Sequence, residues 1–282
     1  MNSIMAMVGF EWRRLLTPGR SFWWLVVAIF PVAIILLMQE LGPLTDVEQW
    51  QRNLSRIQRR DVDVSEARQH IDTLLTVALY FLAPSISCML GCLLTAAPSV
   101  ASELEQHSWT YLATRPNGLF HLVIGKYLVA VMWSGSATVV GLGAALFIAD
   151  IHSKAEAVWA LMGVSVLSAM AYGALFLMIG TIFHRRAMVF CVAYTAAVEL
   201  FLGFFPAVIN RFTIQYRLRS LLFEWTTQSE ELMNSSITQF VDTSEGSMLQ
   251  VLWLVSLTVV FLALSLVSVQ VREFTVAAET DV

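Results

Sequence analysis

The sequence predicts an all-α polytopic membrane protein, and two observations lead to that fold class. Hydrophobic residues make up 57% of the 282 residues and charged residues only 13%, whereas a soluble domain carries about 25% charged residues. Six stretches are also long enough to cross a hydrocarbon core of about 30 Å as helices, and they contain a single charged residue between them. Because backbone polar groups cannot stay unpaired in lipid, each stretch must be helical.

The six predicted spans cover residues 21–39, 73–100, 127–149, 157–183, 187–209 and 247–270. With their connections they form one transmembrane domain, residues 1–282. Six crossings place both termini on one side of the membrane. The shortest loop, His184–Arg186, is purely basic, and short basic loops stay in the cytoplasm. We therefore expect a multi-pass protein of the cell (inner) membrane with both termini in the cytoplasm.

The first twenty residues predict an amphipathic elbow helix that lies along the membrane surface. Apolar side chains recur there at helical spacing, at Ile4, Val8, Trp12, Leu15 and Leu16. The opposite face carries Glu11, Arg13 and Arg14. A helix with one apolar and one charged face suits the interface, and Pro18-Gly19 breaks it before the first span.

Two longer segments, 40–72 and 211–246, are predicted to be external. In the first, Thr45-Asp46-Val47-Glu48 matches a capping box, which indicates a short helix beginning near Val47. The second carries an apolar stripe of Leu218, Leu221, Leu222 and Trp225. We expect short amphipathic helices in both.

The connection between spans two and three, residues 101–126, is predicted to be cytoplasmic. Glu103 and Glu105 are expected to open a short helix, since acidic residues complement the dipole at a helix N-terminus. Pro116 and Asn117-Gly118 end it through turn chemistry. On composition alone, a solvated connector with an interfacial helix accounts for these residues.

This loop resembles the cytoplasmic signature of type-2 ABC exporter permeases. The resemblance is carried by Glu103, His107-Ser108-Trp109, Leu112-Ala113-Thr114-Arg115-Pro116 and Gly125-Lys126. The chain departs from the family at His107 and Ser108, where a Gly-Thr-like pair is usual. The layout of the elbow helix, six spans and an external segment between spans five and six is similar as well.

The resemblance implies a cytoplasmic coupling helix that docks on a separate ABC ATPase subunit. That partner would bind ATP and Mg²⁺, and a second permease protomer, identical or different, would complete the membrane part. The residues implied in the contact or its anchoring are Glu103, Glu105, Trp109, Arg115 and Lys126 in the loop. Arg13 and Arg14 of the elbow helix would form a second cytoplasmic contact. The implied function is ATP-driven export of an unidentified substrate.

No enzyme motif occurs in the chain. A Walker loop ends in Gly-Lys followed by Ser or Thr, but Tyr127 follows Gly125-Lys126. We therefore expect no catalytic, cofactor-binding or metal-binding residues in this chain, and a nucleic-acid partner is excluded by the lack of a basic face. The alternative is an intramembrane enzyme, a sensor, or an anchoring or assembly scaffold without transport. An ATPase partner would distinguish these functions.

Glu199 is the one charged residue within a predicted span. An unpaired charge near the bilayer centre costs about 2.5–3.5 kcal/mol on insertion scales. Glu199 is therefore a candidate for the translocation path or a proton site. The alternative is a structural carboxyl, protonated and hydrogen-bonded to a Ser, Thr or Tyr of a neighbouring helix.

Small and cyclic residues within the spans predict local packing features. Ala137, Gly141 and Ala145 lie four residues apart, which permits close helix contact. Pro31, Pro84 and Pro206 each remove a backbone hydrogen bond and predict kinks.

Overall fold

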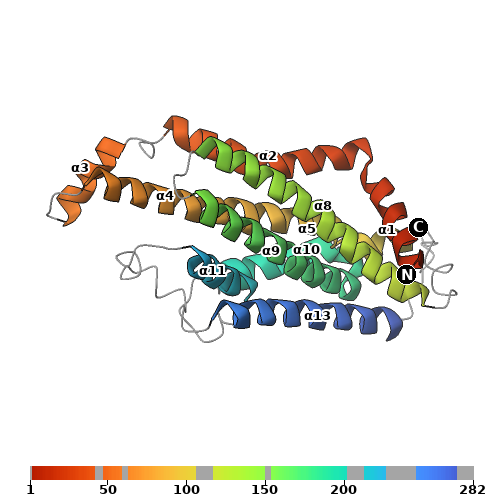
Figure 1. Ribbon diagram of the computed structural model, residues 1–282. Coiled ribbons are helices and arrows are strands. Elements are labelled where there is room, and N and C mark those ends of the chain that lie inside the picture. The colour runs from red at the N-terminus through yellow and green to blue at the C-terminus, as the bar shows by residue number, and fades with distance from the viewer. Residues whose placement is uncertain are drawn as a thin grey trace.

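The computed structural model describes residues 2–41, 47–58, 63–105, 117–149, 154–201, 213–226 and 246–271, and every regular element in these ranges is a helix. Most of the helices run along a common direction and form one elongated bundle (Figure 1). The predicted all-α fold class is therefore confirmed for the part of the chain that is described.

Five of these helical segments are long and apolar enough to cross a membrane: Pro18–Glu40, Ile71–Glu105, Gly118–Ala149, Ala155–Ile182 and Ser247–Val271. They correspond to the predicted spans one, two, three, four and six. The chain is thus a multi-pass membrane protein by the length and composition of its helices. For the predicted fifth span, the described part is helical as α10 (Ala187–Tyr194) and the π-helix η4 (Thr195–Phe201). Its last residues lie outside the described ranges, so the sixth crossing stays a prediction.

The second span is built from several pieces. It runs through α4 (Val64–Tyr80), the π-helix η2 (Phe81–Ser87), α5 (Cys88–Thr95) and, after a turn, α6 (Ser99–Glu105). Pro84 lies inside η2, so the irregularity predicted there takes the form of a widened π turn. Pro31, in contrast, lies inside the continuous helix α2 (Pro18–Leu41), and Pro206 is outside the described residues.

Helix α9 (Lys154–Ile182) is the central span, and α2 and α13 (Ser247–Val271) are peripheral. Two thirds of the most apolar part of α9 is buried, 67%, compared with 22% for α2 and 17% for α13. Tyr172 and Phe176 of α9 are fully enclosed. The outer faces of α2 and α13 expose apolar side chains such as Leu37 and Val259, as expected for helices in contact with lipid.

Helix α1 (Asn2–Leu15) confirms the helix predicted at the N-terminus, although its position along a membrane surface stays a prediction. The chain leaves the helical conformation at Leu16 and Thr17, and α2 then begins at Pro18, a residue suited to the first helical position. Leu15 packs against Val129 and Trp133 of α8 (Gly118–Ala149). Helix α1 and the C-terminal end of α13 lie at one end of the bundle, and α3 (Val47–Gln58) lies at the other (Figure 1).

Two helices begin inside segments that were predicted to connect the spans. Helix α4 begins at Val64, within the segment 40–72, with Asp63 as its N-cap. Helix α8 begins at Gly118, within the connection 101–126. Asn117 supplies the predicted turn in the left-handed conformation (φ 58°), and its carbonyl accepts a hydrogen bond from the backbone N–H of His121. Helix α3 does begin at Val47, but the capping residues Thr45 and Asp46 lie outside the described ranges.

The segment 211–246 contains the helix α11 (Ile214–Trp225), as predicted, and its external position stays a prediction. Leu218, Leu221 and Leu222 of the predicted apolar stripe are buried against α9 and α13. Arg217 is buried too, donating to Gln250 Oε1 over 2.8 Å with its guanidinium 5.3 Å from the ring of Trp253.

The small residues of α8 allow the backbones of α2 and α8 to touch. Ala137 and Ala145 are fully buried, and a Cβ placed on Gly141 would overlap the carbonyl oxygen of Ala28. Hydrogen bonds hold the same two helices together, from Trp24 to Ser136 and from Gln39 to the carbonyl of Ile148, each 3.1 Å. The prediction of close internal packing is confirmed.

Replacing Gly141 by alanine is expected to destabilise the bundle by about 1–3 kcal/mol, the usual cost of overpacking a tight contact. The measurement is the thermal unfolding midpoint of the purified protein in mild detergent. Gly143→Ala is the matched control, because its Cβ would meet only Met162 Cε at 3.8 Å. That variant should be neutral or slightly stabilised, since alanine favours a helix over glycine. Equal midpoints for the two variants would contradict the packing argument.

Candidate functional site

Four charged side chains meet at the end of the bundle where α1 lies. Lys126 Nζ of α8 is 2.8 Å from Glu103 Oε1 of α6 and 3.1 Å from Glu11 Oε1 of α1. Arg14 Nη1 is 2.7 Å from the same Glu103 oxygen and 3.7 Å from Glu11 Oε1. We call Glu11, Arg14, Glu103 and Lys126 the ion cluster.

The ion cluster is buried and electrically balanced. Glu11, Glu103 and Lys126 are only 5%, 4% and 6% exposed, and two carboxylates face two cations. Buried charges are tolerated only when each is paired and hydrogen-bonded, because the desolvation cost is several kcal/mol per ion. Each member meets this condition through the others, and together they join α1, α6 and α8.

Residue spacing on α1 and a glycine on α8 bring the members of the ion cluster together. Glu11 and Arg14 are three residues apart on α1 and therefore share a face, next to the apolar Leu15 that packs on α8. Gly125, beside Lys126, lets α1 approach α8 closely: a Cβ there would be 2.9 Å from Met7 Cγ. This close approach brings Glu11 within reach of Lys126.

The structure brings together three of the seven residues predicted to contact or anchor the coupling region. Glu103, Lys126 and Arg14 lie in the ion cluster, where they contact one another. Arg13 and Glu105 are exposed. Trp109 and Arg115 lie outside the described residues. Glu103 and Glu105 end the described helix α6 instead of opening a helix, so the expected N-terminal dipole interaction is wrong for them.

Sequence reasoning placed Glu11 on the polar face of α1 but missed its part in the ion cluster. The available signal was its spacing of three residues from Arg14. The basic loop η3 (His184–Arg186) lies against α6, at the same end of the bundle, and exposes Arg185 and Arg186. This end therefore combines internal ion pairs with an exposed basic surface.

Glu199 lies in a second buried polar group, here called the Glu199 network. The Tyr172 hydroxyl donates to Glu199 Oε2 over 3.2 Å. The backbone N–H groups of Gln215 and Ile214 donate to the same carboxylate over 3.0 and 3.4 Å. Glu199 therefore occupies the N-terminus of α11, where the helix dipole favours a negative charge.

Gln215 extends the network to the second span. Its Oε1 accepts a hydrogen bond from the Tyr80 hydroxyl over 2.7 Å, and its Nε2 donates to Ser85 Oγ over 2.6 Å. Ser85 lies in the π-helix η2 and Glu199 in the π-helix η4. The network thus joins both widened helical turns through α11.

Glu199 is 3% exposed in this arrangement. The hydrogen bond to a tyrosine of a neighbouring helix, expected for a structural carboxyl, is present in the structure. A role of Glu199 in a translocation path stays a prediction. Among the described residues, no group of three or more His, Cys, Asp or Glu side chains is arranged to hold a metal ion.

No protein-family model matches the chain, and neither a curated protein nor a solved structure matches it.

Proposed function

We propose that this chain is the permease subunit of an ATP-driven ABC exporter, working with a separate ATP-binding subunit and a second permease protomer. Two features support the proposal. The sequence of residues 103–126 resembles the coupling loop of such permeases. Both ends of that loop are also tied to α1, through Glu103 on one side and Lys126 on the other.

The double attachment is the observation that carries the proposal. Glu103 comes shortly before residues 106–116, and Lys126 comes in the third turn of α8, shortly after them. Because both side chains share contacts with α1, a force on the loop would move α1, α6 and α8 as one unit. Such a unit suits the task of carrying a bias from a partner into the spans.

In energetic terms, ATP can drive transport only by favouring one of two states of the membrane part. Closure of two ATP-binding subunits would press on the loops of two protomers. The ion cluster would transmit that displacement into spans two and three, and α8 would carry it to α2 through their tight contact at Gly141. ATP and Mg²⁺ would be bound entirely by the partner.

Site-specific crosslinking tests the proposal. The three cysteines, Cys88, Cys92 and Cys191, are all buried, so an introduced surface cysteine would be the reactive one. The full-length Glu105→Cys variant, captured from its native membrane in mild detergent, should crosslink to a Walker-type ATPase subunit. Glu48→Cys is the matched control, an exposed acidic residue on α3 at the opposite end of the bundle, and should not crosslink to it.

Crosslinking of both positions, or of neither while the protein remains folded, would contradict the proposal. The intramembrane enzyme and the scaffold would then become the leading alternatives.

A further inference from the structure

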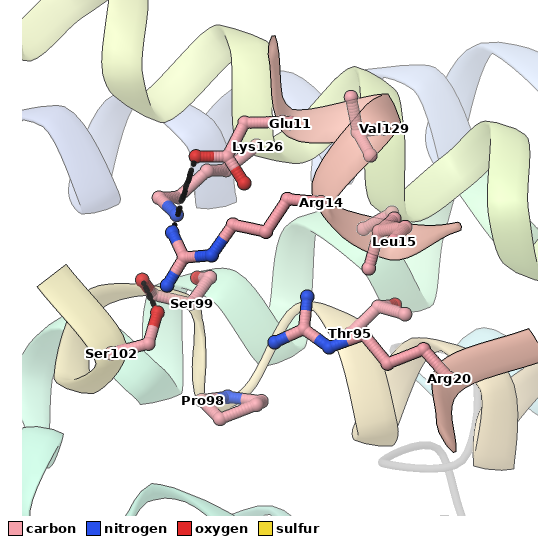
Figure 2. Close-up of a pocket in the computed structure, with 11 residues that line it drawn as sticks. Glu11, Arg14, Leu15, Arg20, Thr95, Pro98, Ser99, Ser102, Lys126 and Val129 are labelled. Atoms are coloured by element: carbon pink, nitrogen blue, oxygen red, sulfur yellow. Dashed lines mark hydrogen bonds and ion pairs between the residues drawn. The ribbon is translucent and has the colours of Figure 1, made fainter. Parts of the chain in front are cut away.

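A pocket opens beside the ion cluster, between α1, the start of α2, the turn from α5 to α6, and α8. Figure 2 shows the guanidinium groups of Arg14 and Arg20 facing the same space, which Thr95 and Pro98 also line. The remaining lining includes the serine pair Ser99 and Ser102 and the apolar side chains Leu15, Val129 and Ala130. With Glu11 and Lys126 of the ion cluster, the lining holds three cationic side chains, one carboxylate and three hydroxyl groups beside a few buried apolar side chains.

Arg20 gives the pocket an excess positive charge. The four members of the ion cluster balance one another. Arg20 is not part of those pairs, and it makes no hydrogen bond or ion pair with any residue that the structure describes. Arg14 donates a hydrogen bond from Nη1 to Glu103. The other N–H groups of its guanidinium can donate to a ligand in the pocket.

The position of Arg20 indicates which ligand meets this charge. Arg20 is the third residue of the first span, and Trp23 and Trp24 lie within the next turn of the same helix. Tryptophans at the start of a span lie at headgroup level. Basic pockets between membrane helices at this level bind the headgroups of anionic lipids.

We propose that this pocket binds the phosphate of an anionic phospholipid, held between Arg14 and Arg20. Planar guanidinium groups suit a phosphate because they can donate two parallel N–H bonds to its oxygens. The inference rests on the location in a membrane and does not require an ATPase partner.

Lipid retention by the purified full-length protein tests the proposal. The protein would be exchanged into mild detergent, mixed with equal amounts of phosphatidylglycerol and phosphatidylcholine, and examined by native mass spectrometry. We expect a clear preference for phosphatidylglycerol in the unaltered protein. Arg20→Gln should reduce that preference about fivefold, the effect of removing one basic residue near an anionic membrane surface. Arg20→Lys should keep more of the preference than Arg20→Gln.

Arg13→Gln is the matched control, because Arg13 is exposed on the same helix as Arg14 and does not line the pocket. It should leave the lipid preference unchanged. An equal loss in Arg13→Gln and Arg20→Gln would mean that only general surface charge is measured, and it would overturn the proposal. Thermal midpoints of both variants, expected to stay close to that of the unaltered protein without lipid, show that each is folded.

Two further outcomes would also overturn the proposal. If inorganic phosphate alone displaces the bound phosphatidylglycerol at millimolar concentration, the pocket is a site for free anions. If Arg20→Gln keeps its lipid preference but loses a protein partner in affinity capture, the pocket receives an acidic protein surface. Lipid preference that depends on Arg20 and survives inorganic phosphate supports the proposal.

Discussion

Replacing Lys126 by methionine is expected to destabilise the protein by about 3–5 kcal/mol, the cost of removing one partner from a buried ion pair. Methionine fills the space of the lysine stem but removes the cation that pairs with both Glu11 and Glu103. Helix α1 should lose its attachment to α8. The measurements are the thermal midpoint in detergent and the rate of proteolysis within α1.

A double variant separates this electrostatic effect from a change in packing. Glu103→Gln combined with Lys126→Met removes one acid together with one base and leaves Arg14 facing Glu11. Since neighbouring members of a charge network are not additive, the double variant should be less destabilised than the sum of the two single variants by about 1–3 kcal/mol. Glu105→Gln is the control for charge alone, because Glu105 is exposed; it should stay within about 0.5 kcal/mol of the unaltered protein.

Additive losses in the double variant would show that the ion cluster is not coupled as its distances indicate. The same variants test the proposed coupling. If α1 is detached by Lys126→Met, movement of the loop should no longer reach the spans. Crosslinking of Glu105→Cys to the ATPase should then persist while transport falls.

The spans were predictable from the sequence because an uncharged stretch of sufficient length has one stable form in lipid, a helix. The N-terminal helix and the apolar stripe of Leu218, Leu221 and Leu222 were predictable from spacing. The Asn117-Gly118 turn indicated where α8 begins. The start of α4 at Val64 was not predicted, because this helix extends beyond the hydrophobic stretch into polar residues.

The ion pairs that join different helices could not be predicted from local sequence patterns. Glu11 and Lys126 are 115 residues apart and Arg14 and Glu103 are 89 apart, so no spacing rule connects them. The resemblance singled out Glu103 and Lys126 but assigned them to a partner contact or its anchoring; of these two roles, their burial favours anchoring. The burial of Arg217 in α11 was not predictable for a related reason, because its partner Gln250 lies 33 residues away on α13.

Glu199 carries the second large prediction. Glu199→Ala removes the carboxylate that accepts from the backbone N–H groups of Ile214 and Gln215 and from the Tyr172 hydroxyl. Each buried donor left unsatisfied costs about 1–3 kcal/mol, so a loss of about 3–5 kcal/mol in folding stability is expected for the group. Glu199→Gln keeps an acceptor oxygen and should lose only about 1–2 kcal/mol.

Comparison of three variants decides what Glu199 does. If it serves as the acceptor that holds α11 in place, stability should fall in the order Tyr172→Phe, Glu199→Gln and Glu199→Ala, from least to most affected. Folded yield from membranes and the thermal midpoint would both follow that order. If Glu199 instead lies in a translocation path, Glu199→Gln should fold with normal stability. The same variant should then change the substrate-stimulated ATPase activity of the assembled complex. Because the carboxylate is enclosed by Tyr172 and the start of α11, we expect the first result: the network would have to open before Glu199 could meet a substrate.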